Sequence, residues 1–175
     1  MSFYQKLAKI GSKFIGKPKM FKYGFNLSPM YRRSTGRIID VSEEDMMDIR
    51  IKLPISYKNR NYVNTIFGGS MFAAVDPIPM VQLMDILGSD YVVWDKSAEI
   101  FFKRPAKENL YAHFSYSLEE IDRIRESIAL KNEAEIVKKT ALTNKDRDIV
   151  FCEVWKTIYI ADKPYFKNKR AKSKK

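Results

Sequence analysis

A glycine pair and a single carboxylate, eight positions apart, are the residues of this 175-residue chain whose types and spacing best suit catalysis. They lie in the segment NYVNTIFGGSMFAAVD, residues 61–76, where Gly68 and Gly69 precede an apolar stretch that contains Asp76. The first turn of a helix offers free backbone N–H donors and the positive end of the helix dipole. An acid buried further along such a helix is a candidate for acid–base chemistry. The combination suits an enzyme that acts on a carbonyl group.

The residues after the glycine pair predict one long helix over 69–87. Its apolar residues occur nearly all round the helix, which indicates burial. Burying a lone carboxylate is costly unless the protein supplies partners. Asp76 therefore has two interpretations: it is satisfied by nearby donors at an irregular turn that Pro77 and Pro79 force, or it is a general base or nucleophile.

The spacing limits how the pair and the acid can work together. Eight helical residues span roughly 12 Å, so one carbonyl cannot contact both the start of the helix and Asp76 of the same chain. In a two-fold dimer with antiparallel helices, Asp76 of one subunit would approach Gly68 and Gly69 of the other. A catalytic role therefore predicts an obligate homodimer, and the sequence leaves a tetramer open.

Alternating apolar and polar residues predict six strands around this helix. The strands are expected at 36–41, 45–55, 90–104, 109–117, 133–143 and 148–160. Residues 118–130 fit either a short helix or a charged extension of a strand. A run of strands around one long helix predicts an α+β domain whose antiparallel sheet buries one face on that helix.

The ends of the chain differ from this domain. Residues 2–15 predict an amphipathic helix, and 27–33 a short helical turn, so that 1–35 form an N-terminal helical extension and 36–162 the main domain. Residues 1–22 hold six lysines and no acid, and 163–175 hold seven basic residues and no acid. We expect 163–175 to be a disordered basic tail. The ends could make weak contact with an anionic membrane surface, whereas residues 23–162 carry a net charge of −2, which disfavours nucleic acid.

Composition excludes several other classes of protein. The single cysteine, Cys152, rules out an internal disulfide and fits a reducing compartment, so we expect a cytoplasmic protein. With one histidine, His113, a Cys/His zinc site is not expected. No metal or cofactor is predicted. The sequence lacks a run of about 18 uncharged apolar residues, so no membrane span is expected either.

The quoted motif and a later segment, SAEIFFKRPAKENLYAHFSYS, resemble the hotdog superfamily, in particular the acyl-CoA thioesterases of the phenylacetate-pathway type. The segments FGG, D-P-x-P-M and VVWDKS are most similar to a domain-of-unknown-function branch of that superfamily. The resemblance covers roughly residues 36–160. It implies a long central helix wrapped by a curved antiparallel sheet of five to six strands, in a dimer with its sites between the helices.

The resemblance also implies roles for individual residues. Asp76 would be the base or nucleophile for hydrolysis of an acyl-CoA or carrier-linked thioester. Gly69, with Gly68, would donate N–H groups to the oxyanion. Asn61 would orient water or the thioester oxygen, and Ser97 would border the site.

Further residues would complete the substrate site. Phe67 stands where those thioesterases often carry His, and Phe72 and Met80 would line the acyl pocket. Independently of the resemblance, Arg104 has two interpretations: it meets the phosphates of a CoA-like ligand, or it belongs to an exposed basic end of a strand. Because of Phe67 and the two prolines, a second hypothesis is a non-catalytic acyl- or lipid-binding hotdog protein that associates peripherally with membranes through its basic ends.

Overall fold

A long helix lying against one antiparallel sheet organises the molecule. The computed structural model describes residue 11 and residues 16–43 and 45–173, so the helix expected over 2–15 falls outside the described residues. The helices are α2 (Lys17–Leu27), α3 (Pro29–Ser34), α4 (Gly68–Val75), α5 (Pro77–Leu87), α6 (Leu118–Lys131) and α7 (Lys163–Lys172). The strands are β1 (Arg37–Val41), β2 (Asp48–Leu53), β3 (Tyr91–Phe102), β4 (Leu110–Ser115), β5 (Glu133–Thr143) and β6 (Val150–Asp162).

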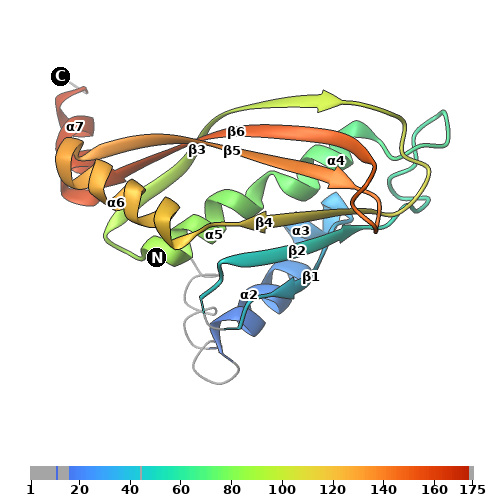
Figure 1. Ribbon diagram of the computed structural model, residues 1–175, viewed down its shortest axis with the longest axis horizontal. Helices are drawn as coiled ribbons and strands as arrows, with labels where there is room; N and C mark the ends of the chain where they lie inside the picture. Colours follow the sequence, from blue (N-terminus) through green and yellow to red (C-terminus); the bar gives the residue numbers. More distant parts are fainter. Residues whose placement is uncertain (1–10, 12–15, 44, 174–175) are drawn as a thin grey trace.

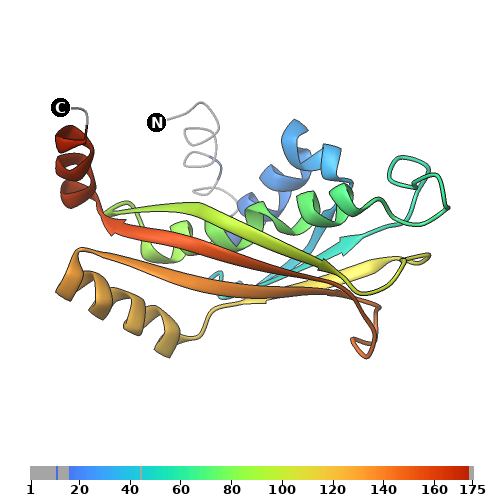
Figure 2. The same cartoon turned by 90° about the horizontal axis from the view of Figure 1, so that it is seen from above.

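The sheet has six strands in the order β1-β2-β4-β5-β6-β3, and each neighbouring pair is antiparallel. All six strands were predicted from the alternation of the sequence. Figures 1 and 2 show α4 and α5 running end to end along one face of this sheet. The apolar residues of both layers meet there and form the core.

The central helix is divided at Asp76, where α4 ends and α5 begins, although Asp76 itself keeps helical backbone angles. Pro77 and Pro79 cannot donate backbone hydrogen bonds, so the regular helix pattern is interrupted here. Side chains from other elements bind the carbonyl groups of this segment: Tyr31 binds that of Ala74, Lys156 that of Asp76, and Tyr116 that of Pro79. By length and composition alone Gly68–Leu87 could cross a membrane. Its position against the sheet accounts for the same apolar composition.

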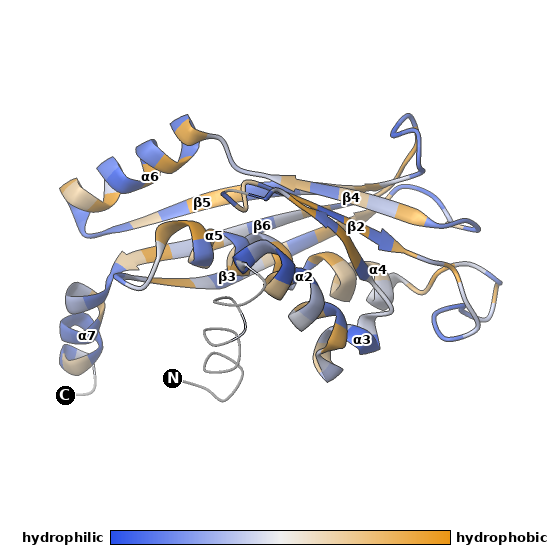
Figure 3. Ribbon diagram, turned by 90° about the horizontal axis from the view of Figure 1, so that it is seen from below, coloured by the Kyte–Doolittle hydropathy of each residue, from blue (hydrophilic) through white to orange (hydrophobic). Residues whose placement is uncertain are grey.

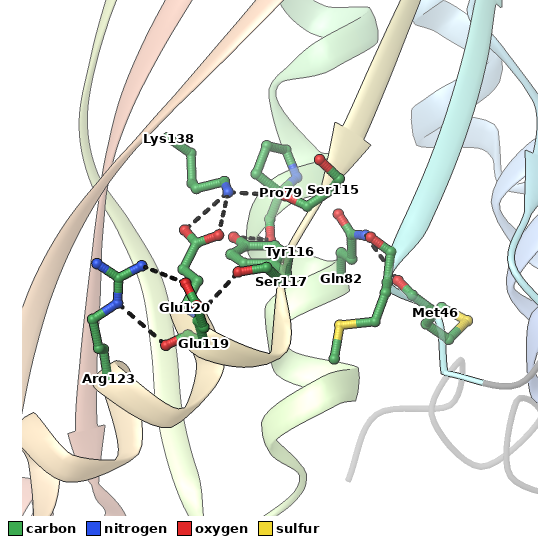
Figure 4. Close-up of polar contacts among 11 residues, drawn as sticks. Met46, Pro79, Gln82, Ser115, Tyr116, Ser117, Glu119, Glu120, Arg123 and Lys138 are labelled. Atoms are coloured by element: carbon green, nitrogen blue, oxygen red, sulfur yellow. Dashed lines mark hydrogen bonds and ion pairs between the residues drawn. The ribbon is translucent and has the colours of Figure 1, made fainter.

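Strands β4 and β5 diverge along the sheet, because they are paired only at Tyr111 and Thr143. Lys138 of β5 spans the gap: its ammonium group donates to the Ser115 carbonyl and to both carboxylate oxygens of Glu120, each at 2.9 Å (Figure 4). It also lies 4.1 Å from the centre of the Tyr116 ring. The divergence makes room for α6 beside the sheet (Figure 2).

Residues 118–130, for which the sequence left two interpretations, form helix α6. The Ser117 hydroxyl accepts from the N–H of Glu120 at its start, and Asn132 ends it in the left-handed conformation. Ile121, Ile124 and Ile128 are buried along one face. Their helical spacing, rather than the charges between them, accounts for the helix.

The expectation of a disordered tail was wrong for Lys163–Lys172, which form helix α7. Its first turn is capped by the Asp162 carboxylate, which accepts from the N–H of Tyr165. Phe166 packs edge-on against Trp94, with ring centres 4.9 Å apart. Lys169 pairs with Glu133 at 2.5 Å. Figure 3 shows that α7 is otherwise mostly hydrophilic, which is why composition alone suggested disorder.

The two edge strands of the sheet, β1 and β3, differ in whether side chains bind their free backbone groups. At β1, Asn26 of α2 donates to the Ile38 carbonyl and accepts from the Ile38 N–H, and Lys22 donates to the Ile39 carbonyl. These side chains occupy the edge of β1. The other edge, β3, is 12 residues long, and most of its side chains are exposed. No other described strand pairs with the outer edge of β3, and an open edge of this kind is able to pair with another strand.

The loop between β2 and α4 is held by Asn59, a buried residue that is 2% exposed. Its side chain donates to the Thr35 hydroxyl at 2.7 Å and to the Pro54 carbonyl at 2.9 Å, and it accepts from the Ser56 N–H at 2.8 Å. Its own carbonyl accepts from the Phe67 N–H at 2.7 Å. Asn59 therefore joins α3, the loop and the start of α4.

We expect Asn59→Ala to lower the free energy of unfolding by about 2–4 kcal/mol, because it removes these bonds and leaves buried partners unsatisfied. Urea unfolding followed by circular dichroism measures this change. Asn168→Ala, at an exposed position of α7, is the matched control. A loss below about 0.5 kcal/mol, the size of an ordinary surface substitution, would contradict the role given to Asn59.

Candidate functional site

Asp76 lies at the junction of α4 and α5, with its side chain 39% exposed. Its Oδ1 accepts a hydrogen bond from Nζ of Lys156 at 2.7 Å, and its backbone carbonyl accepts another from the same group at 2.5 Å. The second carboxylate oxygen, Oδ2, has no hydrogen-bond partner within the described part of the chain. One oxygen is thus fixed by the protein, and the other is free to bind a water molecule.

Lys156 is the partner that the sequence analysis missed. Its side chain is 2% exposed, and it also pairs with a second carboxylate, Asp95 of β3. The signal was present in the sequence: Lys156 stands between Val154 and Ile158 in the alternation of β6, at a position that points into the core. A lysine at such a position requires an acidic partner. In the structure the acidic partners of Lys156 are Asp76 and Asp95.

A β-bulge at Lys96 turns Asp95 toward the helix. Asp95 pairs with Ile158 but Ser97 pairs with Thr157, so Lys96 is the extra residue. Strict alternation along a strand would put Asp95 and Ser97 on one face, and the bulge places them on opposite faces. Asp95 shares the inner face with Lys156, whereas Ser97 lies on the outer face and does not border the helix of its own chain.

Asp95 is less favourably placed than Asp76. Burial raises the pKa of its carboxyl group, although the neighbouring Lys156 acts in the opposite direction. Its Oδ1 is buried and finds no hydrogen-bond partner among the residues that the structure describes. With Lys156 protonated and both acids ionised, the cluster of Asp76, Lys156 and Asp95 carries a net charge of −1.

The glycine pair begins α4, as predicted. Neither the Gly68 nor the Gly69 N–H meets an acceptor in the described part of the chain, as expected for the first turn of a helix. Each glycine lies in close contact with the outer end of an exposed aromatic ring. A Cβ atom on Gly68 would lie 2.6 Å from the Phe102 ring, and one on Gly69 would lie 2.3 Å from the Phe67 ring. The start of α4 therefore lies beside the rings of Phe67 and Phe102.

The side chain of Asn61 forms hydrogen bonds within its own loop. Its side-chain oxygen accepts from the N–H groups of Val63 and Thr65, and its amide donates to the Thr65 hydroxyl at 2.9 Å. These bonds close the turn of residues 61–65 that leads into α4. Asn61 thus shapes the loop, and these contacts do not direct it toward Asp76.

The remaining candidate residues are dispersed. Phe72 of α4 packs against the cluster beneath β1 and β2, and Met80 of α5 packs against the cluster beside α6. Phe67 is 58% exposed. Arg104 is exposed just beyond the end of β3. Among the described residues, Asp76 forms a cluster with Lys156 and Asp95, neither of which was expected to act with it, and Gly69 contacts Phe67. No group of three or more His, Cys, Asp or Glu side chains suited to a metal occurs among the described residues.

A long helix wrapped by a six-stranded antiparallel sheet is the hotdog fold, and solved structures of that fold match this one. A probable thioesterase of otherwise unknown function from Pseudomonas aeruginosa is 17% identical, with a TM-score of 0.71 over 82% of this chain and 95% of its own. A protein of unknown function from Chlorobaculum tepidum is 16% identical, with a TM-score of 0.65 over 83% and 96%. A thioesterase from Haemophilus influenzae is 13% identical, with a TM-score of 0.60 over 82% and 90%.

The family follows from the sequence match. Residues 17–160 match the family described as Domain of unknown function (DUF4442), and the chain belongs to it. A comparison with curated proteins found no significant match. The family match includes α2 and α3, which the sequence analysis had assigned to an extension outside the main domain.

Proposed function

We propose that this protein hydrolyses thioesters, with an acyl-CoA or a carrier-linked acyl group as substrate, at a site formed between two copies of the chain. The observation that carries the proposal is the state of Asp76: one carboxylate oxygen is fixed by Lys156 and the other is free, eight residues after a helix start with unoccupied N–H groups. The likeness to solved thioesterases supports the same class of reaction.

The reaction would proceed by attack of water on the thioester carbonyl. Asp76 accepts a proton from the water molecule while the oxygen of that water molecule bonds to the carbonyl carbon. The resulting oxyanion accepts hydrogen bonds from the N–H groups at Gly69 and Gly68 of the other subunit. The carbon–sulfur bond then breaks, the thiolate takes up the proton, and a carboxylic acid and a thiol leave. Lys156 holds Asp76 in position throughout.

The two sheet edges support a dimer through β3. The edge of β1 is occupied by side chains of α2, whereas β3 is long, exposed and uncovered within the described residues. Phe101 and Phe102 on this strand are 44% and 56% exposed. Exposed aromatic residues along an open strand favour pairing with a second copy. Such a dimer would place the two central helices beside one another.

We expect Phe101→Glu to convert the dimer into a monomer, because it places a charge at an exposed apolar position of the pairing strand, and burying that carboxylate against the second copy is costly. Sedimentation velocity measures the mass in solution. Val137→Glu, at a 59% exposed position on the same outer face of the sheet, is the matched control and should remain dimeric. A Phe101→Glu protein that is still a dimer would exclude this strand as the interface.

Turnover is tested directly by incubating the purified protein with acyl-CoA thioesters of several chain lengths and measuring free thiol. We expect release of thiol with at least one of them. Binding without any release of thiol would contradict catalysis and would support the non-catalytic hypothesis instead.

A further inference from the structure

A strongly basic cavity lies apart from the cluster of Asp76, Lys156 and Asp95. It has a volume of about 490 Å³, which is within the range of small-molecule sites. It lies where α3, the start of β1 and the loop after β2 meet, at the end of the sheet opposite α6 and α7 (Figure 1). Its lining residues are Pro29, Arg32, Arg33, Thr35, Arg37, Pro54, Ser56, Tyr57 and Lys58.

The charge of this cavity is unbalanced. Four of its nine lining residues are Arg or Lys and none is acidic. None of these four cations forms an ion pair with a described acid, although twelve such pairs occur elsewhere in the described structure. Arg37 also stands directly opposite Lys52 in the β1–β2 pair. Like charges opposite one another destabilise a sheet, so a bound anion would relieve a cost that the chain alone leaves in place.

The polar wall of the cavity is fixed in advance. Asn59, which is itself buried, holds the Thr35 hydroxyl, the Ser56 N–H and the Pro54 carbonyl. The loop that carries Tyr57 and Lys58 therefore has a defined position relative to α3. Arginine side chains on such a frame suit the bidentate geometry of phosphate oxygens.

An aromatic ring stands at the mouth of the cavity. Tyr57 is 86% exposed, and Nζ of Lys58 lies 5.7 Å from the centre of its ring. A flat, exposed ring beside several cations suits a ligand with a planar base as well as phosphates, because bases stack on aromatic side chains.

We propose that this cavity binds the phosphates and base of a nucleotide, which belongs to the carrier of the thioester substrate. The identity of that carrier rests on the function proposed above, whereas binding of a phosphorylated nucleotide does not. A structural link joins the two places: the carbonyl of Asn59, next to Lys58, accepts from the N–H of Phe67, the residue before the glycine pair. A nucleotide held here would lie near the start of α4.

Calorimetric titration of the full-length protein with inorganic pyrophosphate and with adenosine 3′,5′-bisphosphate tests the binding. We expect both to bind, more weakly as salt increases. Arg33→Ala combined with Arg37→Ala should raise both dissociation constants at least about 10-fold. Tyr57→Ala should weaken binding of the nucleotide but not of pyrophosphate. Arg123→Ala with Arg125→Ala removes two charges from α6 and should change neither constant. Unaltered binding in the Arg33 and Arg37 variant would overturn the proposal.

Kinetics separate this proposal from the proposed function. In the Arg33 and Arg37 variant, KM for an acyl-CoA should rise about 10-fold or more with little change in kcat. Hydrolysis of the same acyl group on N-acetylcysteamine, which carries no phosphate, should be unaffected. Wild-type turnover with unaltered KM in the variant would refute the nucleotide site alone. Nucleotide binding that depends on these arginines without any turnover would refute the hydrolase alone.

A vesicle experiment tests whether the phosphate that binds in the cavity belongs to a membrane lipid rather than to a nucleotide. Co-sedimentation with phosphatidylcholine vesicles that contain phosphatidylglycerol should not differ between the wild type and the Arg33 and Arg37 variant. Loss of vesicle binding in that variant, with pyrophosphate binding unaltered, would reassign the cavity to membrane lipid and overturn the proposal.

Discussion

Asp76→Asn should lower kcat for thioester hydrolysis by about 10³-fold, within the range that general base catalysis contributes. The substituted amide has the same shape and can still accept a hydrogen bond from Lys156 through its oxygen, but it cannot take a proton from water. The fold should therefore survive, and KM should change little. Initial rates with the best acyl-CoA substrate measure the effect.

Asp85→Asn is the matched control for this substitution. Asp85 is on the same helix and its carboxylate lies 3.7 Å from the ammonium of Lys17, at the surface. We expect its loss to leave kcat unchanged. An Asp76→Asn protein with more than half of the wild-type rate would show that the assigned role is wrong.

Lys156→Met should destabilise the protein by about 3–5 kcal/mol, the cost of breaking a buried ion pair by removing one partner. Methionine has a similar length and no charge, so the main change is electrostatic. Asp76 and Asp95 would then face each other without a cation between them. The backbone carbonyl of Asp76 would also lose the hydrogen bond that Lys156 donates to it. Chemical unfolding at pH 7.5 measures the loss.

A second substitution distinguishes charge from packing. Adding Asp95→Asn to Lys156→Met removes one of the two repelling carboxylates, so the double variant should be more stable than Lys156→Met alone. If the double variant is no more stable, the defect of Lys156→Met comes from packing, and the electrostatic account fails.

The pH dependence follows from the raised pKa of Asp95. Its carboxyl group keeps its proton to higher pH in the folded protein than in the unfolded chain. Its contribution to stability is therefore full below the unfolded pKa, about 3.9, and is lost as pH rises through the folded pKa. Removing the Lys156 charge raises that pKa further, so Lys156→Met should cost less stability at pH 4.5 than at pH 7.5. An equal cost at both values would contradict this.

The architecture was largely predictable because hydrophobic periodicity reports directly on burial. Alternation located the six strands, and the all-round apolar stretch located the central helix with Asp76 near its middle. The two helices that were not predicted, α2 and α7, contain no fully buried residue and depend on contacts distant in sequence. Phe166 against Trp94 is one such contact, and Asn26 against β1 is another.

The site was predictable only in part. The glycine pair and Asp76 were identified from local spacing, but the partner of Asp76 lies 80 residues away on β6. The bulge at Lys96 changed which residues of β3 face the helix, and a single extra residue in a strand leaves no signal in the alternation that precedes it. Pairing across the sheet decides such details, and one sequence does not reveal the register.

Mixed dimers test most directly whether one site combines Asp76 of one subunit with the helix start of the other. Asp76→Asn would be combined with Gly69→Pro, which removes one N–H in the first helical turn, where proline is tolerated, and displaces only the exposed ring of Phe67. Each variant alone should be inactive. Random mixing after unfolding and refolding should restore about a quarter of wild-type activity, because half of the dimers would each contain one intact site. No recovery from correctly mixed dimers would contradict the shared site.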